Sequence, residues 1–126
     1  MSINSYTQPG ANTTKLDLTN VVVAAGNTDL VTAQNNAYGK TYLQTSLQTG
    51  YSIFDIYVCI NQAVSLIVKR YVLSQGYYSM ETLPVEVASQ PNWHSIAVAA
   101  FDQINFQLSG AATIQKLVVM EPKYAT

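Results

Sequence analysis

The chain has 126 residues, 48% of them apolar, which suits one domain with a substantial core and excludes disorder over most of its length. Only 10% are charged, against about 25% in an ordinary soluble domain, and the net charge is −1. This balance excludes the basic surface that binds a DNA or RNA backbone, and Thr, Ser, Asn, Gln and Tyr must supply the polar surface.

Residues 1–14 are polar and contain the breaker pair Pro9-Gly10, so we expect a flexible arm ahead of a domain over residues 15–126. The arm has neither the basic nor the apolar region of a signal peptide, and we expect no export by that route. The longest apolar run, at 21–25, is far too short to cross a membrane.

From Lys15 onward the hydrophobic period is two, and no segment repeats at 3.6 over a useful length. β-Branched and aromatic residues dominate, and turn signals separate the segments. Residues 34–50 are predicted to be a long loop with room for a short strand at 41–47. The other expected strands are 15–23, 30–33, 51–60, 63–73, 77–87, 93–101, 103–109 and 112–122.

The two apolar segments 51–60 and 63–73 are predicted to form an antiparallel hairpin around Asn61-Gln62. Asp55 stands out within the first of them. It is either exposed on the outward face or buried and paired with Lys69 across the hairpin. In 77–87, Pro84 favours a sheet edge or a bulge.

The segment "QINFQLS" at 103–109 alternates apolar and amide side chains. Ile104, Phe106 and Leu108 are expected to face the core, with the amides facing outward. About eight short strands in one chain predict an all-β fold, a single antiparallel β-sandwich.

Catalytic chemistry has little support. His94 is the only histidine, with no second His or Cys at ligand spacing, so we predict no metal site and no cofactor. Cys59 is the only cysteine, expected to be a buried, inert thiol. No nucleophile motif is present, and an enzyme centred on His94 is the weakest alternative. The acids are interpreted as solvated or edge-protecting; they are Asp17, Asp29, Asp55, Glu81, Glu86, Asp102 and Glu121.

Tyrosine is abundant, with nine residues. Tyrosine beside Asn and Gln is typical both of protein interfaces and of sugar-binding faces. The aromatic residues in or near predicted loops that could stack on sugar rings are Tyr38, Tyr42, Tyr77, Tyr78 and Trp93.

The C-terminal part, "NWHSIAVAAFDQINFQLSGAATIQKLVVMEP", resembles the end of small virion proteins of double-stranded DNA viruses and tailed phages. In these, a strand entered by Trp or Phe is followed by a Q-x-N-F-x-L strand and a closing L-V-V-x-E strand. The resemblance covers about residues 51–122. It implies a jelly-roll-like sandwich, often trimeric, that serves as a decoration, minor capsid, head-fibre or tail component.

The resemblance also implies assembly in the host cytoplasm into a virion, with partners such as the major capsid protein, and no nucleic-acid or membrane partner. Apolar positions on the second face of the strands could form the other layer of the sandwich or a subunit interface; they are Ile53, Tyr57, Ile67, Tyr71, Leu117 and Val119. We therefore expect a non-enzymatic structural protein of a virus particle, with a carbohydrate-binding module as the alternative.

Overall fold

The computed structural model describes residues 12–73 and 75–122, and this part of the chain contains strands and loops without a helix. This part of the chain contains no helix that could span a membrane. The strands are β1 (Asn12–Val23), β2 (Tyr51–Ile60), β3 (Leu66–Val72), β4 (Tyr77–Thr82), β5 (Asn92–Ala99), β6 (Gln103–Leu108) and β7 (Ala112–Pro122).

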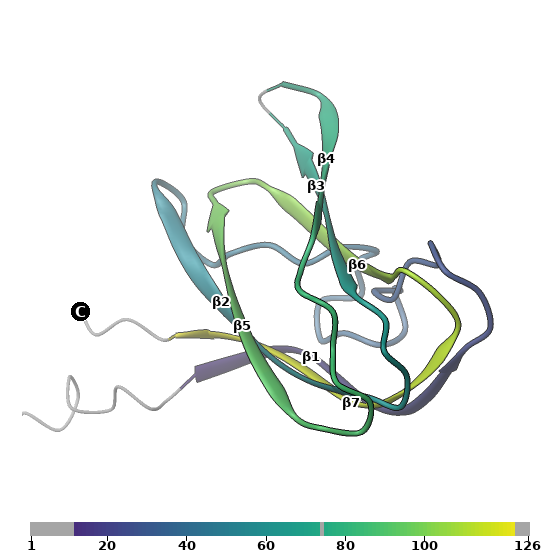
Figure 1. Ribbon diagram of the computed structural model, residues 1–126. Helices are drawn as coiled ribbons and strands as arrows, with labels where there is room; N and C mark the ends of the chain where they lie inside the picture. The colour runs from purple at the N-terminus through teal and green to yellow at the C-terminus, as the bar shows by residue number, and fades with distance from the viewer. Residues whose placement is uncertain (1–11, 74, 123–126) are drawn as a thin grey trace, which may run out of the picture.

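These strands form two antiparallel sheets (Figure 1). Sheet A has the order β1-β7-β2-β5, and sheet B has the order β4-β3-β6. Successive strands repeatedly cross between the sheets, and the first and last described strands are paired from Asn12↔Pro122 to Val23↔Ala112. The architecture is therefore the all-β, antiparallel sandwich that the sequence predicted.

One hydrophobic cluster joins the two sheets. Alternation along β2 turns every second side chain inward, and Phe54 and Val58 are fully buried there. From sheet B, Val68 and Phe106 meet them in the same cluster, and the predicted inward set of β6 (Ile104, Phe106 and Leu108) is fully buried. Alternating apolar positions thus place both layers around one core.

The predicted hairpin of 51–60 with 63–73 does not form. β2 pairs with β5 and β7 in sheet A, whereas β3 pairs with β4 and β6 in sheet B. The connection after Ile60 crosses between the sheets, where the Asn61 side chain accepts a hydrogen bond from the Thr113 N–H at 2.7 Å. Two strands that each bury one face can cover each other from opposite sheets, and periodicity alone does not distinguish this from pairing.

The projecting hairpin consists of β3 and β4 and extends beyond the rest of the sandwich at the top of Figure 1. All six residues of β4 are exposed, and β4 lies at the edge of sheet B. Pro84 follows the end of this strand, which agrees with the predicted sheet edge.

The other edge of sheet B is covered by the segment between β1 and β2. Leu43 exchanges two backbone hydrogen bonds with Ile104 of β6, at 2.8 and 2.9 Å. Leu30 N–H donates to the Phe106 carbonyl at 2.8 Å. Residues 30–33 form no strand, and the predicted strand at 41–47 is reduced to the single bridge at Leu43. The edge of β6 is thereby paired without a full eighth strand.

This cover corrects the interpretation of the amide-rich strand. Asn105 and Gln107 lie on the outward face of β6, yet they are only 7% and 6% exposed. The amides do not face solvent; they hold the covering segment. The expected arm also needs correction, because residues 12–14 belong to β1, while residues 1–11 of that arm lie outside the described part of the chain.

Candidate functional site

The outward face of sheet B carries two rows of side chains across its three strands. In the first row Tyr71 of β3 lies between Tyr78 of β4 and Gln103 of β6. In the second row Lys69 lies between Met80 and Asn105. Directly opposed positions on antiparallel strands place their side chains side by side on one face, so these rows form a continuous surface.

Aromatic and cationic groups pack together at the β4 side of this surface. The rings of Tyr71 and Tyr78 meet edge to face, with centroids 5.5 Å apart and planes at 66°. The Lys69 Nζ lies 4.7 Å from the centroid of the Tyr78 ring. These contacts orient the exposed Tyr78 ring, which would otherwise be free on an edge strand.

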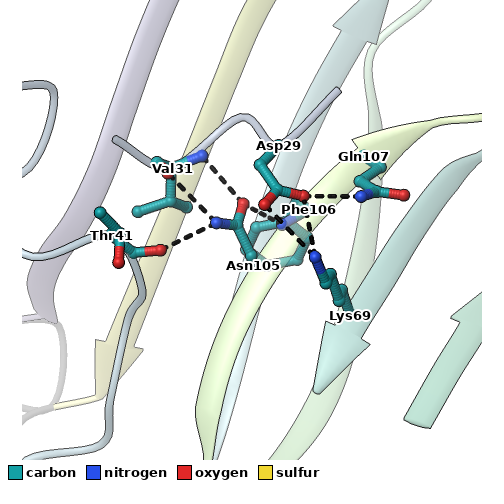
Figure 2. A network of polar contacts seen from close by, with 7 residues as sticks. All are labelled: Asp29, Val31, Thr41, Lys69, Asn105, Phe106 and Gln107. Carbon is teal, nitrogen blue, oxygen red and sulfur yellow. Dashed lines mark hydrogen bonds and ion pairs between the residues drawn. The ribbon is translucent and has the colours of Figure 1, made fainter. Parts of the chain in front are cut away.

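The segment between β1 and β2 forms a wall on the β6 side, and Asn105 holds it in place (Figure 2). The Asn105 Nδ2 donates to the carbonyls of Val31 and Thr41 at 3.1 and 2.9 Å. The Oδ1 accepts from the N–H groups of Val31 and Phe106 at 2.9 and 2.7 Å. A buried amide with both donors and its acceptor engaged fixes two separate points of the wall.

Asp29 closes the same network from the other end of the wall (Figure 2). Its carboxylate accepts a hydrogen bond from the Gln107 Nε2 at 2.6 Å and pairs with the Lys69 Nζ at 3.3 Å. The two charges are partly exposed, so the pair itself adds little stability. Asp29 and Lys69 neutralise each other, and no other charged residue among those described lines this part of the outward face of sheet B.

Between the wall and the rows of sheet B lies a cleft of about 440 Å³, which we call the sheet B cleft. Three tyrosines line it together with Thr, Gln and Asn side chains. The lining residues are Asp29, Val31, Thr32, Ala33, Gln34, Thr41, Tyr42, Lys69, Tyr71, Tyr78, Gln103 and Asn105.

The outward face of sheet A carries a group of apolar and aromatic side chains, and we call it the sheet A face. Tyr57 of β2 lies between Trp93 of β5 and Val118 of β7. The Tyr57 and Trp93 rings pack edge to face, with centroids 5.1 Å apart. Ile53 and Met120 extend the same face, and Tyr57, Val118, Ile53 and Met120 are all half-buried.

Of the described residues, two acids lie on the sheet A face: Asp17 lies opposite Val118, and Asp55 accepts a hydrogen bond from the Ser95 Oγ at 2.8 Å. Lys69, its proposed partner in the sequence analysis, pairs with Asp29 instead. Of the two alternatives for Asp55, the outward position is therefore correct. Cys59 also lies on β2 and is half-buried, with its Sγ 3.3 Å from the Gln115 Oε1, so its thiol is not in the core as expected.

A buried ion pair lies at the end of the sandwich where β1 begins. The β1–β7 register shifts between Thr14 and Leu16, so Lys15 occupies a β-bulge. The Lys15 Nζ lies 3.1 Å from the Glu121 Oε1, and both side chains are almost completely buried. Strict alternation with the buried Leu16 and Leu18 would turn Lys15 outward, and the bulge is why it points inward.

The carboxylate of Glu121 is stabilised in its charged form. Burial disfavours ionisation, but hydrogen bonds outweigh it and lower the pKa of Glu121 from 4.5 to about 2. The donors are the Thr45 hydroxyl, the Ser46 N–H, the Lys15 ammonium and Ser52. This constellation joins β1, β7 and the segment before β2, so its role is structural.

A second buried pair joins β5 to the loop before it. The His94 Nε2 lies 2.6 Å from the Glu86 Oε2, and the Glu86 side chain is 0% exposed. No hydrogen bond reaches the other oxygen, Oε1, within the described residues. The Glu86 carboxylate is closed off from solvent, and the pair fastens the loop to β5.

Three acids interpreted as solvated are in fact buried: Glu86, Asp102 and Glu121 are 2%, 7% and 1% exposed. Asp102 accepts hydrogen bonds from the Arg70 Nη1 at 3.0 Å and the Ala99 N–H at 3.2 Å. The charged partners Arg70 of Asp102 and Lys15 of Glu121 come from distant parts of the sequence, which no local pattern reveals. Among the described residues, no three His, Cys, Asp or Glu side chains form a group that could hold a metal ion.

The aromatic residues proposed for sugar binding are divided between several places. Tyr42 and Tyr78 line the sheet B cleft. Tyr38 lies against Lys15, 4.9 Å from ring centroid to Nζ, beside a smaller pocket that Tyr42 also lines. Tyr77 is exposed on the projecting hairpin, and Trp93 belongs to the sheet A face.

The proposed interface residues are likewise divided. Ile53 and Tyr57 lie on the sheet A face, whereas Ile67 and Tyr71 lie on the outward face of sheet B. Leu117 and Val119 are 0% exposed in the core. For these two residues the correct alternative is packing between the two layers of the sandwich, and not a subunit interface.

The sequence analysis did not assign Asp29, Lys69, Gln103 or Asn105 to a site. Period-two alternation places Lys69 with Tyr71, and Gln103 with Asn105, on outward faces. Their meeting depends on strand order, which alternation does not give.

No protein-family model, no curated protein and no solved structure matches this chain.

Proposed function

We propose that this chain is a non-enzymatic structural protein that acts through contacts between subunits, as a component of a virus particle. The observation that carries the proposal is the composition of the sheet A face. The resemblance of residues 51–122 to small virion proteins supports the choice of particle. A decoration protein, a minor capsid protein and a fibre component all fit this role.

An antiparallel sheet with one solvated face normally alternates apolar inward and polar outward residues. The sheet A face departs from that pattern, because Ile53, Tyr57, Val118 and Met120 all point away from the core. Exposed apolar surface of this kind marks protein–protein contact. Trp93, which is 56% exposed and rests on Tyr57, supplies the aromatic anchor that dominates many interfaces.

The partner that fits this face is a second copy of the chain. The charged groups in its rows already have partners, because Asp55 is hydrogen-bonded to Ser95 and Asp17 pairs with Lys116, so association leaves no unpaired charge among them to desolvate. Lys116 and Asp17 pair at 2.7 Å on the β1 side of this face, so they could meet a partner as a neutral pair. A closed homotrimer is the favoured assembly, with the major capsid protein as a further partner.

The mass of the assembled species tests this proposal. We expect light scattering after size exclusion to give three times the mass of the chain for the wild type. Val118→Asp places a charge in the centre of the sheet A face and should reduce the species to a monomer that keeps its β-sheet circular dichroism. Val85→Asp, in the exposed connection after β4, is the matched control and should leave the mass unchanged.

Two results would overturn the assembly part of the proposal: a wild-type protein that is monomeric up to high concentration, or a Val118→Asp variant that assembles as the wild type does. The particle itself is tested separately, by mass spectrometry of the proteins in purified virions. The virions to be analysed are those of a virus in whose genome this gene lies beside capsid genes. If the chain is absent from these particles, the viral assignment is wrong.

A further inference from the structure

The sheet B cleft has the size and preorganisation of a small-molecule site. Its volume of about 440 Å³ lies within the range of roughly 300–1,000 Å³ for such sites. The wall is held at Val31 and Thr41 by Asn105, and the floor is the regular surface of β3 and β6. A ligand entering the cleft would not have to order either side, which lowers the cost of binding.

The charges of the cleft favour an uncharged ligand. Asp29 and Lys69 are the only charged residues in its lining, and they pair with each other at 3.3 Å. A phosphate or carboxylate would find no unpaired cation among these residues, and a cationic ligand would find no unpaired acid. Selection by net charge is therefore absent, and hydrogen bonding and shape must decide what binds.

The hydrogen-bonding groups left open are those that both donate and accept. Asn105 is fully engaged in holding the wall, so it belongs to the scaffold. By contrast, no hydrogen bond within the described residues engages the Gln103 amide or the hydroxyl groups of Tyr42, Tyr71 and Tyr78. A ligand that offers many hydroxyl groups, each a donor and an acceptor, matches this set.

The tyrosine rings supply the apolar part of the site. Tyr78 is 60% exposed, and Tyr71 and Tyr42 are half-buried beside it in the lining. A ring face is electron-rich and attracts the weakly positive C–H groups of a flat apolar ligand surface. A pyranose presents such a C–H surface on one side and hydroxyl groups around its rim.

From these features we propose that the sheet B cleft binds a neutral saccharide, with the sugar ring against the tyrosines and its hydroxyl groups bonded to Gln103 and the Asp29–Lys69 pair. The site goes beyond the structural role proposed above, and it lies on the sheet opposite the sheet A face. A virion component with such a cleft can assemble through one face and bind surface glycans through the other. The two proposals fail independently, because their residues do not overlap.

The test is a glycan array probed with the purified full-length protein, followed by titration calorimetry with the strongest soluble hit. Adjacent tyrosines on β4 give a matched pair of variants, since alternation turns their side chains to opposite faces. Tyr78→Ala and Gln103→Ala should each weaken saccharide binding at least tenfold. Tyr77→Ala, which is 52% exposed but not part of the lining, should bind as the wild type does.

Thermal melting of each variant distinguishes loss of the site from loss of the fold. If Tyr78→Ala unfolds at a lower temperature than the wild type, the binding test relies on Gln103→Ala. An array without any neutral saccharide above background overturns the proposal. So does a saccharide that binds equally to the wild type, Tyr78→Ala and Gln103→Ala, because it must then occupy another surface. Light scattering on the same samples reports the sheet A face, and its result leaves the outcome for the cleft unaffected.

Discussion

Replacing Glu121 with glutamine removes the charge from the buried carboxylate that Lys15 contacts at 3.1 Å. The variant retains the shape of the side chain and loses its negative charge. A buried ammonium is then left without its counter-ion, which costs about 3–5 kcal/mol when one member of such a pair is removed. We expect Glu121→Gln to be less stable than the wild type by this order at neutral pH.

The pH dependence of this difference in stability between the wild type and Glu121→Gln is a more specific test of the buried pair. The pKa of Glu121 falls from 4.5 in the unfolded chain to about 2 in the folded protein. At about 1.4 kcal/mol per pKa unit, the lowering corresponds to about 3 kcal/mol of stability at neutral pH. Because the folded pKa is the lower one, this stability is present above about pH 5 and is lost as the pH falls toward 2. Linkage places about 2 kcal/mol of the loss between pH 5 and pH 3.

Urea unfolding at a series of pH values measures the effect. The difference in unfolding free energy between the wild type and Glu121→Gln should shrink by about 2 kcal/mol from pH 5 to pH 3. Glu81→Gln, at an exposed position on β4, is the control, and its difference from the wild type should stay constant within about 0.5 kcal/mol. A constant difference for Glu121→Gln over the same range would refute the account of the buried pair.

Three further substitutions test the packing. Asn105→Leu strands four backbone groups and should lower the unfolding free energy by about 2–4 kcal/mol in urea. Gly26→Ala places a Cβ 2.9 Å from the Ser109 carbonyl oxygen, so thermal melting should show a loss of about 1–3 kcal/mol. Leu117→Ala empties a fully buried position and should cost about 2–5 kcal/mol in urea, against less than about 1 kcal/mol for Val118→Ala. An unchanged midpoint for any of the first three contradicts the contacts described for that residue.

Local patterns located the seven described strands, although they also predicted strands at 30–33 and 41–47 that do not form. The alternation of Phe54, Ile56 and Val58 marks β2 with its full bounds, because burying one face of a strand requires a period of two. The inward set of β6 follows by the same reasoning. These predictions depend only on neighbours in the sequence.

Partners distant in the sequence could not be predicted in the same way. Asp29 and Lys69 are brought together by strand order, and Lys15 turns inward at a bulge. The alternation of β6 places Asn105 on the outward face, and it gives no sign that the segment between β1 and β2 covers this side chain. The candidate site is built from such contacts. The sequence therefore identified two of its aromatic residues, Tyr42 and Tyr78, but did not show that they line one cleft.

The pairing of Asn12 with Pro122 has a consequence for how the protein can be used or extended. Because these two residues are partners, β1 begins and β7 ends at the same end of sheet A, on the left of Figure 1. A host protein could therefore accept the whole unit inside one of its own surface loops, with entry and exit points close together. Cargo fused at both flanks would be carried on a single side, leaving the far end of these strands, where Val23 pairs with Ala112, unobstructed.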